Sequence, residues 1–401
     1  MSRITVPLSC SSTSVFFMLL VVMWVSLIWM LTLTAGKMRH SHIHMSENEV
    51  SCRSRNYQTA GSTKCQILWP ESLGVPPPEV TEQNTQTPRP DVCNDCFKLN
   101  LKPILQTTDI CRPIAGGKSP LVVAFITCTV EGRDVRDAIR NTWASYSRSN
   151  TAFMRYFFIV GRTDNATLQD ALVLENDIFH DIVQYDFKDT YRNLTIKTMV
   201  GLQHAVKYCK TAEFVLKTDS DVYVNVPAFS HLLNSYKNTS SETGGHVENG
   251  HNGMFGRLHN RALPIRNTSV SFREKWIVSK TEYPRSVYPK YLDGHAYVLP
   301  TSVARAVVDV SKDIPFFHLE DVYVGLCLEH LGYEVKGTRG FLRVKTPLPV
   351  CSYKYDNVYF VHRLDSPYML KVWEASCSNT GKAQFWKRLR QGEWTNTNMK
   401  T

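Results

Sequence analysis

The most informative segment of the chain is Glu213-Phe-Val-Leu-Lys-Thr-Asp-Ser-Asp221. Its apolar run has the length of a strand and ends on two carboxylates, Asp219 and Asp221. In an extended chain, residues two apart point the same way, so the two carboxylates converge on one point. A hard divalent cation accepts such oxygen ligands and can in turn hold substrate phosphates. Turns also favour Asp and Ser, so a solvated strand end is the alternative for the tripeptide taken alone.

Strand-like and helix-like segments alternate before this stretch. Strands are predicted over residues 121–127, 154–160, 178–185 and 214–218, and helices over residues 133–144 and 191–208. The alternation predicts an α/β fold with a mostly parallel central sheet that helices cover on both faces. In such sheets, ligands bind at the carboxyl ends of the strands, where the acidic pair would lie. The sequence has no G-x-G-x-x-G and no Walker loop, so a dinucleotide or P-loop fold has no support.

A second pair of carboxylates, Glu320 and Asp321, begins a segment with helical periodicity. Apolar residues follow at spacings i, i+3, i+4 and i+7, namely Val324, Cys327, Leu328 and Leu331. The two acidic residues then lie at the N-terminus of a predicted helix, where they could simply cap it and favour its dipole. In the functional interpretation, a carboxylate distinct from the first pair removes a proton from an attacking group.

Two further patterns have both a structural and a functional interpretation. Arg133, Arg136 and Arg140 share one helical face, which could be a solvated basic face or a site that recognises phosphate. His362 ends the apolar run over residues 357–362, where it could be a core residue or a nitrogen ligand to a borderline metal such as Mn²⁺.

The N-terminus predicts the location of the protein. Residues 15–35 are almost wholly apolar, and about twenty such residues in a helix reach roughly 30 Å, enough to cross a bilayer. Four N-x-S/T sequons follow this segment, at Asn165, Asn193, Asn238 and Asn267. Ten of the eleven cysteines also follow it, which suits an oxidising compartment, and a disulfide is favoured over zinc for Cys93-x-x-Cys96. The prediction is therefore a single-pass type II membrane protein whose C-terminal part is lumenal.

Composition and charge set the remaining limits. The chain has 401 residues, 43% of them hydrophobic, which allows one large domain with appendages or two domains. We predict a cytoplasmic tail over residues 1–14, an anchor over 15–35, a lumenal stem over 36–117 and a folded domain over 118–401. The net charge is +10, but Lys and Arg are scattered and no reader motif is recognisable, so nucleic acid is not an expected partner.

Six ordered motifs together resemble the β1,3-galactosyltransferase family, which also includes β1,3-N-acetylglucosaminyltransferases. They are Arg136-Asp-Ala-Ile-Arg-Asn-Thr-Trp143, Asn193-Leu-Thr-Ile-Lys-Thr-Met-Val-Gly-Leu202, Lys217-Thr-Asp-Ser-Asp-Val-Tyr-Val-Asn225, Tyr288-Pro-Lys-Tyr291, Glu320-Asp-Val-Tyr-Val-Gly325 and Val361-His-Arg363. The resemblance covers residues 119–375. It implies a Golgi membrane enzyme with a GT-A fold, a Rossmann-like nucleotide-sugar fold, that uses a UDP-sugar and Mn²⁺ on a glycan acceptor.

The resemblance also implies roles for individual residues. The expected metal ligands are Asp219, Asp221 and His362, with Asp219 also beside the ribose. The residues expected near the nucleotide are Arg136, Arg140, Lys217 and Asp219. Asp321 matches the general base, with Glu320 beside it. The implied reaction is inverting: Asp321 accepts the proton of an acceptor 3-hydroxyl while that oxygen attacks C1 of the donor sugar.

One stretch departs from the family pattern. After Tyr288-Pro-Lys-Tyr291 the chain continues Leu292-Asp-Gly-His-Ala-Tyr-Val298, with His295 and Ala296 where small residues and Gly are usual. This segment is expected to be a loop that borders the sugar or the acceptor. We favour UDP-galactose as the donor, with UDP-N-acetylglucosamine or UDP-N-acetylgalactosamine as alternatives. The alternative from another class is a lumenal chaperone that kept the fold and lost catalysis.

Overall fold

The computed structural model describes residues 88–112, 119–147, 153–242, 253–377, 381–391 and 393, all within one structural unit, Leu73–Thr401. The predicted cytoplasmic tail, anchor and first part of the stem lie outside these residues. Within the described ranges, no helix combines the length and the apolar character that a membrane span requires.

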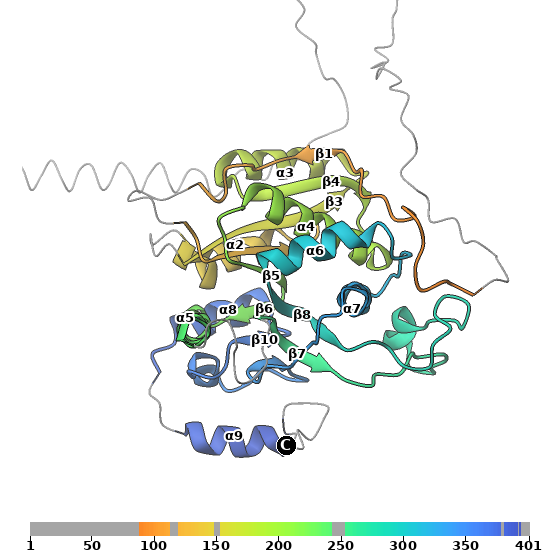
Figure 1. Ribbon diagram of the computed structural model, residues 1–401. Helices are drawn as coiled ribbons and strands as arrows, with labels where there is room; N and C mark the ends of the chain where they lie inside the picture. Colours follow the sequence, from red (N-terminus) through yellow and green to blue (C-terminus); the bar gives the residue numbers. More distant parts are fainter. Residues whose placement is uncertain are drawn as a thin grey trace, which may run out of the picture. The chain divides into compact units, whose positions relative to one another are not determined.

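The described residues form a seven-stranded sheet with the strand order β1-β4-β3-β2-β5-β8-β7 (Figure 1). Its strands are β1 (Pro103–Leu105), β2 (Val122–Thr127), β3 (Met154–Arg162), β4 (Ile182–Lys188), β5 (Phe214–Asp219), β7 (Phe255–His259) and β8 (Tyr291–Pro300). Strands β4, β3, β2 and β5 run parallel to their neighbours in this group, as predicted. Strands β1, β8 and β7 are antiparallel to their neighbours, so the complete sheet is mixed.

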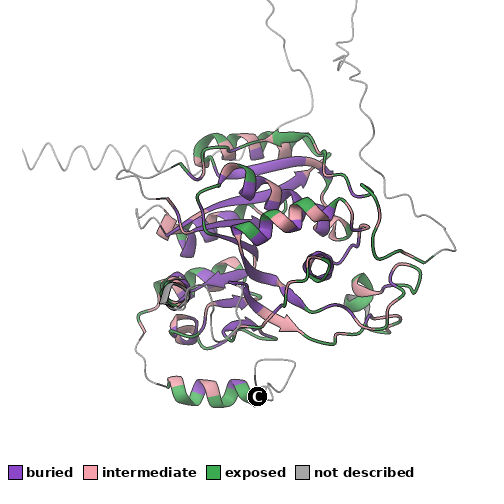
Figure 2. Cartoon of the chain, in the orientation of Figure 1, coloured by how far each residue is buried: buried purple, intermediate pink, exposed green. Residues whose placement is uncertain are grey.

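Helices cover both faces of this sheet, as the alternating pattern predicts. The helices of the described residues are α2 (Arg133–Asn141), α3 (Ala166–Phe179), α4 (Leu194–Tyr208), α5 (Val226–Glu242), α6 (Thr301–Ser311), α7 (Glu320–His330), α8 (Ser366–Glu374) and α9 (Lys382–Arg390), of which α9 lies apart from this sheet (Figure 1). Strand β2 shows the two-sided packing, because Val123 and Phe125 join the core with α4, α6 and α7, whereas Ala124 joins the core with α2, α5 and α8. Strands β2, β3, β5 and β8 are accordingly buried along most of their length, whereas the edge strands β1 and β7 are more exposed (Figure 2).

A smaller three-stranded sheet adjoins the carboxyl end of β5. It contains β6 (Val222–Val224), β10 (Phe360–His362) and β9 (Phe341–Arg343), in the order β6-β10-β9. Strand β6 follows β5 after only Ser220 and Asp221. The acidic pair therefore lies at the junction of the two sheets.

Two segments differ from the sequence-based prediction. Residues 178 and 179 are the end of α3, which closes at His180 with a left-handed backbone (φ 51°), and β4 begins only at Ile182. The prediction was wrong here because the apolar pair Ile178-Phe179 resembles the start of a strand. Helix α3 also lacks a strong periodic apolar face, so the sequence did not reveal a helix over these residues. Short 3₁₀ turns extend or precede two predicted helices, at Trp143–Ser147 and Tyr191–Asn193.

The described part of the predicted stem packs onto the folded domain. Strand β1 pairs with β4, and Cys111 forms a disulfide with Cys209 at the end of α4. Phe97 is buried and its backbone N–H donates to the carbonyl of Lys312 (3.1 Å). The folded region thus begins earlier than the predicted boundary at residue 118. These contacts bridge residues far apart in sequence, so local composition does not reveal them.

Candidate active site

The structure brings together the three residues predicted to bind a metal. Asp219 ends β5, and Asp221 precedes β6. Because β6 pairs antiparallel with β10, His362 lies opposite Val222 and beside Asp221. The Nε2 atom of His362 is 3.1 Å from Oδ2 of Asp221, and one potential ligand atom from each of the three residues lies within 4.8 Å of the others.

Hydrogen bonds fix the carboxylate of Asp219. Its Oδ1 atom accepts from Thr127 Oγ1 (2.7 Å) on the neighbouring strand β2 and from Lys217 Nζ (2.5 Å). The register of β2 and β5 places Thr127 directly opposite Asp219. Two donors at Oδ1 leave Oδ2 as the oxygen that can serve a ligand.

Lys217 connects the two pairs of carboxylates. Its side chain is buried, and Nζ also donates to the carbonyl of Gly294 and lies 3.2 Å from Oε1 of Glu320. Burial lowers the pKa of the ammonium, but the charges of Asp219 and Glu320 outweigh it, so the net pKa is raised. Lys217 was predicted to contact the nucleotide. In the structure its side chain lines the cavity, but its ammonium group already contacts oxygen atoms of the protein.

The second carboxylate pair begins α7 but does not cap it through a side chain. The N-cap residue is Leu319, which makes no side-chain cap bond, and Oδ1 of Asp321 accepts from the N–H of Val322 (2.9 Å). Glu320 is buried, with Oε2 accepting from Tyr297 OH (3.2 Å). Asp321 is more exposed, and its Oδ2 accepts from the N–H of Gly294 (3.2 Å). A Cβ at position 294 would collide with the Glu320 carboxylate, which explains the glycine.

Both carboxyl groups have a raised pKa. Burial raises the pKa of Glu320 to about 7, against the opposing charge of Lys217. Burial and the nearby Asp293 raise the pKa of Asp321. A raised pKa makes an ionised carboxylate a stronger base, so the site suits proton abstraction near neutral pH.

The pKa of Glu320 predicts a pH dependence of stability. Between its value in an unfolded chain, about 4.3, and about 7, the folded protein keeps a proton that the unfolded protein releases, so this group's contribution to stability falls as the pH rises. Glu320→Gln cannot ionise and should gain on the order of 3 kcal/mol relative to the unsubstituted protein between pH 4.5 and pH 8. Urea unfolding of both proteins across this range measures the difference. Parallel stability curves would show that Glu320 does not titrate there.

These residues line a cavity of about 320 Å³. One wall carries Lys217, Asp219, Glu320, Asp321 and His362, and aromatic side chains form much of the rest, namely Tyr191, Trp276, Tyr288 and Tyr291. Aromatic rings beside carboxylates are typical of pockets that bind rings with hydroxyl groups. The cavity therefore combines a candidate cation site, a candidate base and a surface for packing an organic ligand.

A buried carboxylate that was not predicted from the sequence, Asp293, organises several side chains at the cavity. Its Oδ2 atom is 2.9 Å from His259 Nε2 and 3.5 Å from an Arg343 nitrogen, and its Oδ1 is 2.7 Å from His295 Nδ1. The ring of His259 stacks on Tyr291 with centroids 4.7 Å apart. The sequence pointed to this part of the site only through the departure of residues 292–298 from the family pattern. The structure places these residues in β8 at the cavity, not in a loop as predicted.

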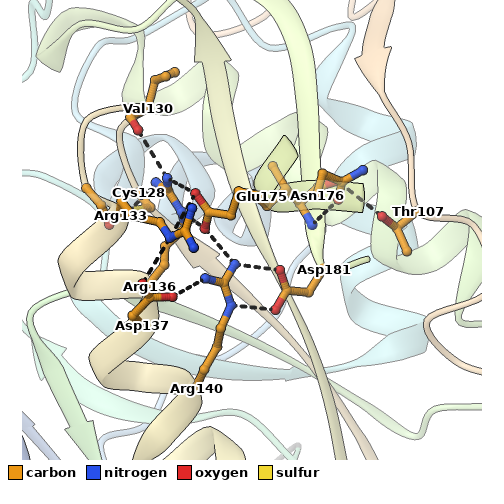
Figure 3. Close-up of polar contacts among 12 residues, drawn as sticks. Thr107, Cys128, Val130, Arg133, Arg136, Asp137, Arg140, Glu175, Asn176 and Asp181 are labelled. Carbon is orange, nitrogen blue, oxygen red and sulfur yellow. Dashed lines mark hydrogen bonds and ion pairs between the residues drawn. The ribbon is translucent and has the colours of Figure 1, made fainter. Parts of the chain in front are cut away.

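Arg136 and Arg140 lie elsewhere, in a buried ion-pair network (Figure 3). Arg136 donates to both carboxylate oxygens of Glu175 (2.8 and 2.7 Å), and Arg140 donates to both of Asp181 (2.9 and 2.8 Å). Neither residue lines the cavity described above. Helical spacing correctly predicted that the two share a face, but that face meets acidic side chains of the protein. We therefore do not retain either residue as a nucleotide ligand.

Substitution of Arg140 distinguishes a structural role in the buried ion-pair network from the predicted role in binding the nucleotide. Arg140→Met leaves Asp181 buried without its partner and is expected to reduce the free energy of unfolding by about 3–5 kcal/mol. UDP affinity, measured on the folded fraction by calorimetry, should stay unchanged. Arg133→Met is the matched control, because Arg133 is half-exposed on the same helix and should cost less than about 1 kcal/mol. Lost UDP affinity at unchanged stability would restore the nucleotide role.

The cysteines and sequons can be placed as well. Disulfides join Cys93 to Cys96, Cys111 to Cys209 and Cys351 to Cys377, so the predicted disulfide role of the Cys93-x-x-Cys96 motif is confirmed. Asn165, Asn238 and Asn267 are exposed. Asn193 is half-buried, and its Nδ2 donates to the carbonyl of Lys188 (2.8 Å), so glycosylation there would have to break this bond.

Comparisons with known proteins identify the family of this chain. The family model described as galactosyltransferase matches residues 134–339. The chain is 34% identical to β-1,3-galactosyltransferase 5 of Mus musculus over 70% of this chain and 85% of that protein, and 34% identical to β-1,3-galactosyltransferase 1 of Homo sapiens over 63% and 73%. The solved structure of the galactosyltransferase LgtC with donor and acceptor sugar analogues aligns over 66% of this chain and 99% of that one, with a TM-score of 0.31 and 10% identity. The extent and identity of the sequence matches show that this chain is a glycosyltransferase and belongs to the galactosyltransferase family.

Proposed function

We propose that the protein transfers galactose from UDP-galactose to the 3-hydroxyl of an acceptor sugar on a glycoprotein or glycolipid and forms a β1,3 linkage with inversion. The observation that carries this proposal is that Asp219 and His362, which cluster with Asp221, line the same cavity as Asp321. The names of the related proteins support galactose as the transferred sugar. The parallel strands that end at the acidic pair are consistent with a GT-A fold.

The residues present fit a bound Mn²⁺. Asp219 offers its Oδ2, Asp221 offers a carboxylate, and His362 offers Nε2, a donor set that suits a borderline cation. Burial raises the pKa of Asp221, but the hydrogen bond and charge of His362 outweigh it and keep the carboxyl ionised. When bound, such a cation supplies Lewis-acid neutralisation of charge on the departing diphosphate.

The chain's own residues supply positioning and proton transfer. Asp321 accepts the proton of the acceptor hydroxyl, because it is the more exposed carboxylate of its pair and its pKa is raised. Glu320 and Lys217 form a buried pair that fixes the positions of the neighbouring carboxylates Asp321 and Asp219 relative to each other. The aromatic wall packs against the sugar rings and excludes water from the reacting atoms.

The donor alternative is a UDP-N-acetylhexosamine on the same scaffold. His295 lines the cavity at a position where the family resemblance predicts a small residue, and we expect this side chain to influence whether an N-acetyl group fits. A chaperone that lost catalysis is the weaker alternative, because the carboxylates needed for metal binding and proton transfer are all present.

The proposed location is the Golgi membrane, in the single-pass type II orientation. The apolar segment over residues 15–35 supports an anchor. Three disulfides and three exposed sequons in the described residues suit an oxidising lumen where glycosylation occurs.

A donor panel tests the proposal. The purified protein is assayed with UDP-galactose, UDP-N-acetylglucosamine and UDP-N-acetylgalactosamine, each with Mn²⁺ and after chelation. We expect turnover with UDP-galactose that chelation abolishes. Turnover only with an N-acetylhexosamine donor would establish the alternative, and a folded protein inactive with every donor would favour the chaperone.

A further inference from the structure

Two buried ring nitrogens beside the proposed metal site lack a hydrogen-bond partner among the described residues. They are Nδ1 of His362 and Nε2 of His295. The two rings lie with their centroids 5.4 Å apart and their planes inclined by 28°. Buried polar atoms are usually paired, so two unpaired nitrogens in neighbouring rings need an explanation.

The contact of His295 with Asp293 determines which ring nitrogen of His295 carries the proton. Nδ1 is 2.7 Å from Oδ1 of Asp293. An ionised carboxylate only accepts hydrogen bonds, so Nδ1 of the neutral ring carries the proton and Nε2 keeps a lone pair. Asp293 is itself held by His259 and Arg343, which prevents it from turning away.

His362 has the complementary requirement. Its Nε2 atom faces Asp221 and is the ligand atom of the candidate metal cluster. A neutral histidine that binds a cation through Nε2 carries its proton on Nδ1, and metal-binding histidines almost always donate that proton to an acceptor. Among the described residues around this ring, the unpaired acceptor is Nε2 of His295.

We propose that His295, oriented by Asp293, accepts a hydrogen bond from Nδ1 of His362 when a divalent cation is bound, and thereby orients the metal ligand. His295 is thus a positioning residue, the middle of a chain from His362 to Asp293. The ring centroids lie 5.4 Å apart, and forming the bond requires the rings to turn until the Nδ1–H of His362 points at Nε2 of His295. The inference rests on the proposed metal site.

Metal affinity tests the inference without any sugar transfer. Mn²⁺ is titrated into the full chain, and free Mn²⁺ is followed by electron paramagnetic resonance. His295→Leu removes both nitrogens at similar volume and should raise the Kd for Mn²⁺ by about 10–100-fold. His295→Gln returns an acceptor near the position of Nε2 and should recover most of the affinity.

His318→Leu is the matched control. His318 is also buried, lines the same cavity and has an unpaired Nε2, but its ring neighbours that of Phe317 at a tilt of 47° and it is not among the metal-site residues. It should leave the Kd for Mn²⁺ unchanged. Equal loss in both variants would show that any buried histidine matters here, which would overturn a specific role for His295.

Other outcomes separate this inference from the proposed function. Unchanged Mn²⁺ affinity in folded His295→Leu, or a Gln variant as weak as the Leu variant, would refute the role of His295 while the metal site stands. An unsubstituted chain that binds no Mn²⁺ would refute the metal site itself.

A second measurement needs no substitution and remains available should the Leu variant not fold. Spectra of ¹⁵N-histidine-labelled full chain with diamagnetic Cd²⁺ should show both rings protonated on Nδ1. A proton on Nε2 of His295 would overturn the inference.

Discussion

Asp321→Asn is expected to lower kcat for sugar transfer by about 10²–10⁴-fold, the usual contribution of a general base. Asparagine cannot accept the proton of the acceptor hydroxyl, yet its side-chain oxygen can still accept one of the backbone N–H bonds that Asp321 receives from Val322 and Gly294. The fold and UDP binding should therefore persist. Steady-state kinetics together with calorimetric UDP titration measure both properties.

Two comparisons make the Asp321 result specific. Asp309→Asn changes an exposed aspartate on α6 and should leave kcat unchanged. Because the pKa of Asp321 is raised, we expect the activity of the unsubstituted protein to rise with pH as Asp321 ionises, and we expect this rise to disappear in Asp321→Asn. A variant that keeps a near-normal rate would show that another group is the base.

Asp221→Asn is expected to reduce kcat/KM by about 10³-fold or more, because a bound cation contributes several kcal/mol to the stabilisation of developing charge. Asparagine removes the carboxylate charge that lies beside Nε2 of His362 at the junction of β5 and β6. Mn²⁺ affinity should fall in parallel and can be measured in the absence of sugar. Asp309→Asn again serves as the control.

Two other results for Asp221→Asn would contradict this prediction. Wild-type Mn²⁺ affinity in a folded Asp221→Asn variant would show that the cation binds elsewhere. Loss of transfer with unchanged metal affinity would assign Asp221 to the donor sugar instead of the metal.

The core of the site was predictable because it depends on short-range patterns. Alternation in a strand places Asp219 and Asp221 together, and helical periodicity places Glu320 and Asp321 at one helix end. The prediction for His362 came from the family resemblance, since a histidine that ends an apolar run is more often a core residue. Its place beside Asp221 depends on the pairing of β6 with β10 across a long stretch of chain.

The rest depends on contacts that local sequence cannot reveal. The spacing of Arg136 and Arg140 shows a shared face, but only the fold shows that Glu175 and Asp181 lie opposite. Asp293 gains its role from partners on β7 and β9, which come together only in the folded protein. Similarly, the composition of residues 88–112 suggests a stem, whereas a strand pairing and a disulfide attach them to the domain.

The linkage of the product tests the central proposal most directly. The protein is incubated with UDP-galactose, Mn²⁺ and a panel of simple glycosides of N-acetylglucosamine, N-acetylgalactosamine and galactose, and the product is analysed by NMR. We predict a galactose in the β configuration on the 3-hydroxyl of the acceptor, formed only while Mn²⁺ is present. An α-linked product, a different acceptor position or transfer that persists after chelation would contradict the account.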